Sequence, residues 1–227
     1  MIFLSGVTNA AIEDRLIALG IGLLVTPHMA GGGPKRIPLF PCWAADNGCF
    51  SDRWTEMPWL DWLATLPTDG CLFAVAPDVY PDAQASLDRG LQYADLIRSM
   101  GFPVAIVAQD GAEDIRYPWD EFDCLFIGGA KTANPKDEWK ISPQAEQVCR
   151  AARNAGKWVH MGRVNSLRRM ERARSMGVQS CDGTFIKHGP EINLKRMARF
   201  LQLLAATPAL PMDRWESVSH PTHREFA

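Results

Sequence analysis

Short apolar runs recur along the chain and are separated by segments whose apolar residues repeat at helical spacing. The runs are mostly continuous rather than alternating, which is typical of parallel strands buried on both faces. We expect eight strands, at Ile2–Ser5, Gly22–Val25, Cys42–Ala45, Leu72–Ala76, Val104–Ala108, Cys124–Ile127, Trp158–Met161 and Gln179–Cys181.

Four of the helical segments stop at a glycine, which is the residue expected just after a helix end. The expected helices are Ala10–Leu19, Ala83–Met100, Pro143–Ala155, Ser166–Met176 and Asn193–Ala205. Eight strands alternating with helices favour a closed barrel over an open doubly wound sheet. No glycine-rich dinucleotide fingerprint or Walker loop opposes this choice.

The predicted fold class is therefore α/β, with a single (β/α)8 TIM-type barrel whose active site lies at the C-terminal ends of the strands. We expect the barrel to cover residues 1–207 and an irregular tail to cover residues 208–227, where the chain becomes proline-rich and loses its periodicity. The glycine-rich segment Ala30–Pro41 is expected to be a mobile loop.

A length of 227 residues suits one barrel, and a hydrophobic fraction of 47% is ordinary for a globular protein. No apolar stretch approaches the roughly 18 residues of a membrane span, and the apolar start lacks the basic leader of a signal peptide. The six cysteines form no CxxC pair and no zinc-like spacing with histidine. We expect a cytoplasmic protein with reduced cysteines, without a membrane partner and without a bound metal.

The charges are unevenly distributed along the chain. Residues 1–149 carry 10 basic and 20 acidic side chains, whereas residues 150–199 carry 12 basic and 3 acidic ones. A basic segment of this kind indicates a polyanionic partner. It is equally compatible with a solvated helix face whose charges pair with the acidic part of the chain.

Polar residues and glycines follow the expected strands, at positions that would form one rim of the barrel. Asp46 and Asp182 each end an apolar run and precede a glycine closely. Two carboxylates facing one pocket can exchange a bond to a sugar, because one acts as the nucleophile while the other transfers the proton. Taken alone, each aspartate is also a plausible helix cap or turn residue.

The order of these rim motifs resembles the tRNA-guanine transglycosylase superfamily, in particular its phage and bacterial branch that places deazapurines in DNA (DpdA-type proteins). The resemblance runs from about Pro41 to Thr184. It implies that Asp46, in Ala-Asp-Asn-Gly-Cys-Phe, transfers protons and that Asp182, in Ser-Cys-Asp-Gly, is the nucleophile. The implied base-binding residues are Phe50, Asp78, Gln109, Gly128, Gly129, Ala130 and Met161.

The chemistry of guanine fits this set. Asp78 can accept hydrogen bonds from N1–H and the 2-amino group, and Gln109 can donate to O6. Phe50 and Met161 can contact the two faces of the ring. From composition alone, residues such as Phe50 and Met161 more often belong to a hydrophobic core. Asp78 and Gln109 could each cap the helix that follows.

The chain also departs from the tRNA enzymes of this superfamily. They are longer and carry a zinc-binding insertion of three cysteines and a histidine after the nucleophile, whereas no cysteine follows Cys181 here. We therefore expect DNA and a free 7-deazaguanine base as partners and no cofactor or zinc. The sequence leaves open whether the chain forms a homodimer. A phage-encoded protein would act in the host cytoplasm. The residues expected to bind nucleic acid are Arg163, Lys131, Lys187, Arg168 and Arg169.

Three other functions stay open at this point. The same aspartates would serve a tRNA-guanine transglycosylase or a nucleosidase that releases the base. A catalytically inactive barrel could bind DNA alone. An aldolase of the Schiff-base type would need a buried lysine on a strand, and no expected strand contains one.

Overall fold

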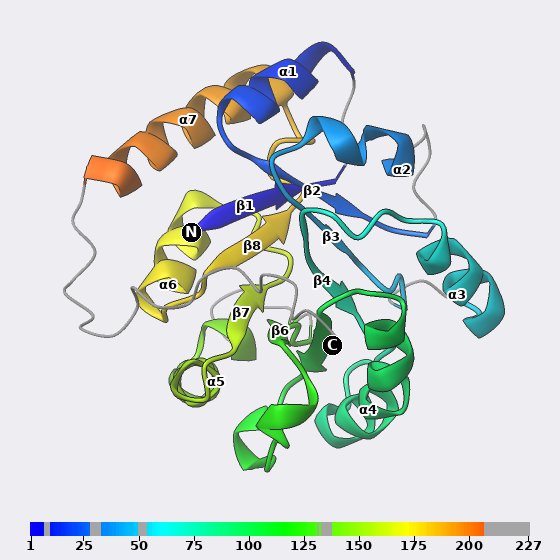
Figure 1. Cartoon of the computed structure of the whole chain (residues 1–227). Coiled ribbons are helices and arrows are strands. Elements are labelled where there is room, and N and C mark those ends of the chain that lie inside the picture. Colours follow the sequence, from blue (N-terminus) through cyan, green and yellow to red (C-terminus); the bar gives the residue numbers. More distant parts are fainter. Residues whose placement is uncertain (7–9, 28–32, 50–53, 131, 133–137, 207–227) are drawn as a thin grey trace.

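Eight parallel strands pair in sequence order and close into a barrel, because β8 pairs with β1 (Figure 1). The computed structural model describes residues 1–6, 10–27, 33–49, 54–130, 132 and 138–206. The strands are β1 (Ile2–Ser5), β2 (Gly22–Val25), β3 (Trp43–Ala45), β4 (Cys71–Val75), β5 (Val104–Ala108), β6 (Cys124–Ile127), β7 (Trp158–Met161) and β8 (Ser180–Gly183). The predicted (β/α)8 fold is confirmed, and each strand lies within two residues of its expected bounds.

Helices surround the barrel and connect the strands (Figure 1). They are α1 (Ala10–Ala18), α2 (Gly33–Arg36), α3 (Glu56–Ala64), α4 (Ala83–Ser99), α5 (Pro143–Asn154), α6 (Leu167–Ser175) and α7 (Pro190–Ala206). Four single 3-10 turns join them, η1 (Ile37–Leu39), η2 (Ala112–Asp114), η3 (Trp119–Glu121) and η4 (Trp139–Ile141). The expected tail, residues 208–227, lies outside the described residues.

Three connections differ from the expectation. The segment expected to be a loop contains α2 and η1, with Pro34 in the first turn of α2, where its missing N–H costs nothing. Helix α3 was not predicted; Pro58 is its third residue, and Trp59 and Leu63 share its buried face one turn apart. Between β5 and β6 the connection consists of η2 and η3.

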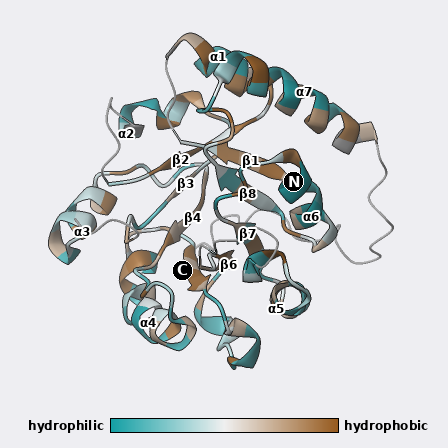
Figure 2. Cartoon of the chain, turned by 180° about the vertical axis from the view of Figure 1, so that it is seen from behind, coloured by the Kyte–Doolittle hydropathy of each residue, from teal (hydrophilic) through white to brown (hydrophobic). Residues whose placement is uncertain are grey.

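The alternation of side chains along each strand creates two cores. Inside the barrel lie residues such as Leu4, Phe73 and Val107. Their neighbours in sequence, such as Phe3 and Ile106, point outward and pack with the helices. Figure 2 shows the consequence for the outer layer, in which α1 and α7 carry both hydrophobic and hydrophilic residues. Each strand therefore presents one inward and one outward set of residues. Which set faces inward, here called the phase of the strand, decides which side chains reach the site.

Among the helices in the described part of the chain, none has the length and apolar character that crossing a membrane requires.

Candidate active site

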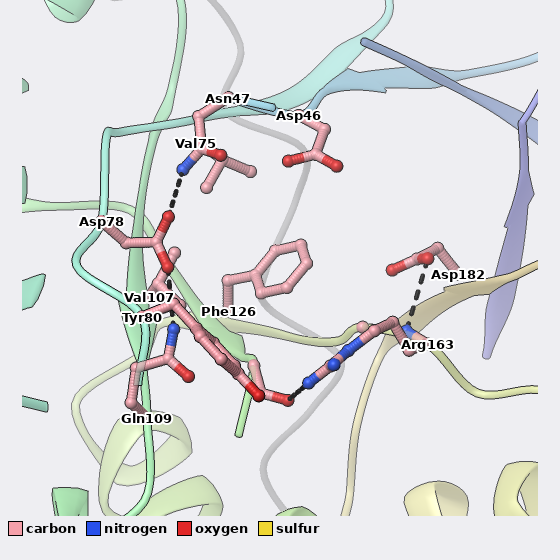
Figure 3. Close-up of a pocket in the computed structure, with 12 residues that line it drawn as sticks. Asp46, Asn47, Val75, Asp78, Tyr80, Val107, Gln109, Phe126, Arg163 and Asp182 are labelled. Carbon is pink, nitrogen blue, oxygen red and sulfur yellow. Dashed lines mark hydrogen bonds between the residues drawn. The ribbon is translucent and has the colours of Figure 1, made fainter. Parts of the chain in front are cut away.

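A pocket of about 90 Å³ lies at the carboxyl ends of the strands (Figure 3). A single water needs roughly 10–15 Å³ on such a measure, so the pocket has room for several groups of that size. The structure brings together residues from six consecutive strands: Asp46 after β3, Asp78 after β4, Gln109 after β5, Gly128 after β6, Gly162 after β7 and Asp182 on β8.

Asp182 faces the pocket from β8, and nitrogen atoms approach both of its carboxylate oxygens. His160 Nε2 lies 3.0 Å from Oδ2, and the backbone N–H of Arg163 donates to Oδ1 at 3.4 Å. Gly162 makes this arrangement possible, because a Cβ there would lie 2.7 Å from the ring of Phe126 and 3.4 Å from Asp182 Oδ2. A carboxylate has about four lone-pair positions, so further positions stay available for a ligand in the pocket.

His160 is fully buried beneath Asp182. Its Nδ1 lies 2.8 Å from Ser180 Oγ, which in turn accepts a hydrogen bond from Trp158 Nε1 at 2.7 Å. The imidazole contacts two phenyl rings that also contact each other, with centroid separations of 4.9 Å to Phe73 and 4.7 Å to Phe126. A line of polar groups thus runs from the inside of β7 and β8 up to the carboxylate.

Asp46 faces the same pocket from the end of β3 (Figure 3). Its side chain accepts a long hydrogen bond from the N–H of Gly48 at 3.3 Å, and the backbone N–H of Asn47 also acts on it. Burial raises the pKa of Asp46 to about 7, and the nearby negative charge of Asp182 contributes in the same direction. The carboxyl therefore exchanges a proton near neutral pH, as a general acid and base requires.

Asp78 is held by two side-chain amides. Asn47 Nδ2 donates to Oδ1 at 3.0 Å, and Gln109 Nε2 donates to Oδ2 at 2.7 Å. Burial raises the pKa of Asp78, while these two hydrogen bonds act against the rise. Gln109 is buried, and its Oε1 has no hydrogen-bond partner among the residues that the structure describes. In this orientation Gln109 presents an acceptor, rather than the expected donor to O6.

The glycine segment after β6 reaches the pocket only in part. Gly128 lines it, but its N–H donates to Ala108 O, and the N–H of Ala130 donates to Asp110 Oδ1 at 2.7 Å. Gly129 lies behind the pocket, against Trp139. The N–H groups of Gly128 and Ala130 are therefore already used within the protein, and the expectation that this segment binds a base stays a prediction.

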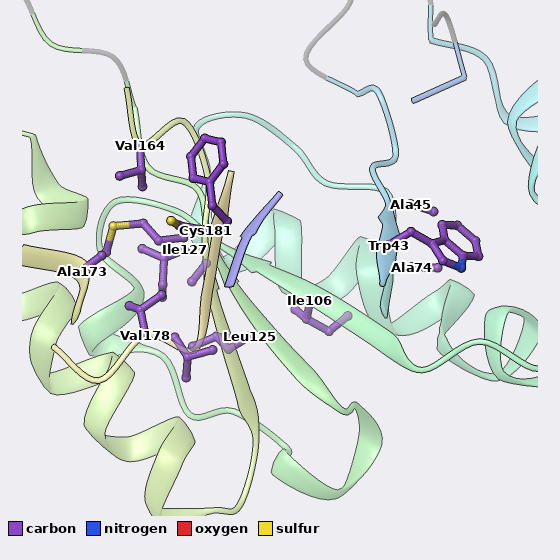
Figure 4. Close-up of a cluster of buried hydrophobic side chains, with 14 of the residues drawn as sticks. Trp43, Ala45, Ala74, Ile106, Leu125, Ile127, Val164, Ala173, Val178 and Cys181 are labelled. Atoms are coloured by element: carbon purple, nitrogen blue, oxygen red, sulfur yellow. The ribbon is translucent and has the colours of Figure 1, made fainter. Parts of the chain in front are cut away.

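Met161 was expected to contact one face of a base, and the structure contradicts this. Its side chain is fully buried in the outer core. The same core contains Ile127, Val164 and Cys181 (Figure 4). The reason is the two-residue period of β7: His160 pairs with Ser180 on the inward side, so Met161 and its partner Cys181 point outward. Phe126 and Tyr80 are the aromatic residues that line the pocket. Phe50 lies outside the described residues.

The expected nucleic-acid contacts fall into different environments. Arg163 lines the pocket, and its Nη2 donates to the carbonyl oxygens of Gly128, at 3.0 Å, and Gly129. Arg169 forms an ion pair with Glu138 at 2.8 Å. Arg168 and Lys187 are exposed, the former near the start of α6 and the latter after β8. Lys131 lies outside the described residues.

Two buried polar residues near the pocket were missed in the sequence. His160 is the polar residue in an otherwise apolar strand, which is a signal that could have found it. Lys140, in η4 between Trp139 and Ile141, is buried and donates to Gly162 O at 3.0 Å. Burial lowers the pKa of Lys140 to about 8, and the positive charge of Arg163 adds to this effect. Lys140 thus supports the backbone of the segment that donates to Asp182.

Within the described residues, no group of three or more histidine, cysteine or acidic side chains is arranged to hold a metal ion. No protein-family model and no curated protein sequence matches the chain. A solved structure that is similar in fold is the crystal structure of the YdjI aldolase from Escherichia coli K12, with a TM-score of 0.50 and 12% sequence identity. The match covers 92% of this chain and 91% of that one. At this identity the similarity concerns the barrel fold alone.

Proposed function

We propose that this chain is a pentosyltransferase that exchanges guanine in DNA for a 7-deazaguanine, such as 7-cyano-7-deazaguanine (preQ0), through a covalent aspartyl-sugar intermediate. The observation that carries the proposal is the pair formed by Asp46 and Asp182, which line one pocket from β3 and β8. The two carboxyl groups are held differently, with donors at both oxygens of Asp182 and a pKa of about 7 for Asp46. This division matches the needs of a nucleophile and a proton carrier.

The target nucleotide would be turned out of the duplex, because C1′ and the base edge are inaccessible within the stack. An oxygen of Asp182 bonds to C1′ while the bond from C1′ to N9 breaks. The electron pair of that bond stays with the base, and Asp46 gives its proton to the leaving guanine. The products of this half are free guanine and an ester between Asp182 and the sugar.

The second half reverses these events with a different base. The 7-deazaguanine enters the emptied pocket, and Asp46, now ionised, takes its N9 proton. N9 attacks C1′ and displaces the Asp182 carboxylate. Two inversions restore the original configuration at C1′, as in retaining glycosidases.

Asp78 supports recognition of the base. Its carboxylate accepts from Asn47 and Gln109 and keeps lone pairs for the N1–H and 2-amino groups of a guanine-like edge. The unpartnered Gln109 Oε1 is a further acceptor beside it. A purine with acceptors in place of these donors would leave buried oxygens unpaired, which costs roughly 1–3 kcal/mol for each group.

DNA is favoured over tRNA because the chain lacks the zinc-binding insertion of the tRNA enzymes that it resembles. Arg168 and Lys187 are exposed and basic, and they would contact phosphates of the flanking strand. Such contacts should weaken steeply as the salt concentration rises.

Mass spectrometry of nucleosides tests the proposal. Duplex DNA, single-stranded DNA and tRNA are each incubated with the protein and preQ0, and the digested products are compared. We expect deoxynucleosides of preQ0 in DNA together with free guanine, and neither with Asp182→Ala. Incorporation into tRNA alone would overturn the choice of substrate. Free guanine without incorporation would show a nucleosidase instead.

A further inference from the structure

The proposed nucleophile rests on a buried line of side chains that the reaction chemistry does not itself require. The line consists of Trp158, Ser180 and His160. Ser180 Oγ lies 2.7 Å from Trp158 Nε1 and 2.8 Å from His160 Nδ1, and His160 Nε2 lies 3.0 Å from Asp182 Oδ2. All four side chains project inward from β7 and β8, because alternate residues on these adjacent strands face the barrel interior.

The donor and acceptor roles along this line follow from its first member. An indole N–H can only donate, so Ser180 Oγ accepts from Trp158. The single serine hydrogen is then available for His160 Nδ1, which accepts it. With Nδ1 acting as an acceptor, the ring proton lies on Nε2 and points at Asp182 Oδ2.

The other protonation patterns leave groups unsatisfied. A proton on Nδ1 would compete with the serine hydrogen, and in the neutral ring it would turn the Nε2 lone pair toward a carboxylate oxygen. The imidazole is fully buried and packs against Phe73 and Phe126. An unmade hydrogen bond in such surroundings costs roughly 1–3 kcal/mol. The neutral tautomer with Nε2–H satisfies every member of the line.

We infer that His160 is a positioning residue that holds the Asp182 carboxylate aimed at the sugar, in a tautomer fixed by Ser180 and Trp158. The inference rests on the proposed function, since it assigns His160 to the nucleophile of that reaction. A hydrogen bond from a neutral donor favours the charged carboxylate without cancelling its charge. It also fixes the side chain at Oδ2, while the N–H of Arg163 approaches Oδ1.

Three substitutions of His160 separate hydrogen bonding from packing. His160→Gln keeps an N–H donor near the position of Nε2. His160→Asn places its amide near Nδ1 and leaves Asp182 without this donor, and His160→Phe keeps a ring of similar size without any donor. We expect Asn and Phe to slow formation of the covalent DNA–protein adduct in a single turnover by about 10–100-fold, the range typical of residues that orient a reacting ligand. The KM for preQ0 should stay within about twofold, and His160→Gln should recover most of the rate.

Rates are compared with melting temperatures, and the tautomer is measured separately by nitrogen-15 NMR of histidine-labelled protein. If the rate of adduct formation falls in parallel with the melting temperature, and His160→Gln is no faster than His160→Phe, His160 contributes packing alone. A proton on Nδ1 would overturn the inference irrespective of activity. If Asp182→Ala abolishes adduct formation while His160→Phe reacts like the wild type, the inference alone fails. If the wild type forms no adduct, the proposed function fails and the role of His160 fails with it.

Discussion

Asp182 and Asp46 face one pocket, but the two sides of the barrel hold them in opposite ways. On the β7–β8 side, His160 and the N–H of Arg163 direct hydrogen bonds to the two oxygens of Asp182. On the β3–β4 side, Asp46 accepts a long hydrogen bond from the N–H of Gly48 at 3.3 Å, and the carboxylates of Asp182 and Asp78 act on it together with burial to raise its pKa. Donors favour a charged carboxylate, whereas burial beside other carboxylates favours a protonated one.

Two identical side chains would thereby take different roles in the proposed reaction. Each environment comes from strand register: β8 places Ser180 and Asp182 inside, next to the inward His160 of β7. The end of β3 instead places Asp46 beside Asn47, whose amide is already used by Ala76 O and Asp78. The assignment of nucleophile to Asp182 and proton carrier to Asp46 therefore rests on neighbours rather than on the carboxyl groups themselves.

The largest effect is expected for Asp182. Replacing it by Ala or Asn removes the only oxygen nucleophile in the proposed first step, so guanine exchange should fall by at least about 10³-fold. The adduct seen on a denaturing gel should disappear, while binding of the DNA should persist. Exchange that survives in both variants would reverse the comparison and point to Asp46 as the nucleophile.

Asp46→Asn should have a smaller effect that depends on the leaving group. Loss of a general acid typically costs about 10²–10⁴-fold, so release of guanine should slow within that range. Deoxyguanosine methylated at N7 carries a cationic base that leaves without protonation, and here the variant should come within about tenfold of the wild type. Base release is measured chromatographically on matched oligonucleotides. An equal loss on both substrates would show that Asp46 does not act as the acid.

The pH dependence should differ between the two substrates. The first half needs protonated Asp46, whose pKa is about 7, so kcat/KM for DNA should fall as the pH rises through about 7. The second half needs ionised Asp46, so kcat/KM for preQ0 should rise with pH. Because the ester removes the charge of Asp182, which helps to raise the pKa of Asp46, this second midpoint should lie below 7. Initial rates from pH 5 to 9 measure both limbs.

Asp46→Asn provides the control for this pH dependence, since an amide does not titrate in the range. Both limbs should flatten in the variant. If the pH dependence of kcat/KM for DNA or for preQ0 persists unchanged in Asp46→Asn, another group is responsible for the titration.

The barrel and its rim could be predicted because they depend on local patterns. Continuous apolar runs gave all eight strands, and the rule that parallel strands end at one rim placed Asp46, Asp78, Gln109 and Asp182 together. Helix α3 was missed because its buried positions, such as Trp59 and Leu63, are few and a proline lies in its first turn.

What could not be predicted depends on the phase of a strand and on pairing across the fold. The continuous apolar pattern of β7 does not decide whether His160 or Met161 faces inward, because both faces of a barrel strand are buried. The polarity of His160 is the local signal that marks it, and it does not by itself fix the direction of the side chain. The ion pair of Arg169 with Glu138 likewise joins residues that are separated in sequence by an entire strand. The prediction placed Met161 at the site, whereas the neighbouring residue His160 faces inward and contacts Asp182. The error is a shift of one residue along β7.

The smallest expected effects test that phase directly. Met161→Leu nearly conserves volume in the outer core, so it should cost less than about 1.5 kcal/mol of stability and leave the KM for preQ0 unchanged. Phe126→Leu removes an aromatic ring that lines the pocket, and aromatic contacts are worth about 0.5–1.5 kcal/mol. Its KM for preQ0 should therefore rise by about 2–12-fold, measured alongside melting temperatures for both variants. If Met161→Leu raised the KM and Phe126→Leu did not, the inward set of residues on β6 and β7 would have to be the opposite one, and His160 could not then lie beneath Asp182.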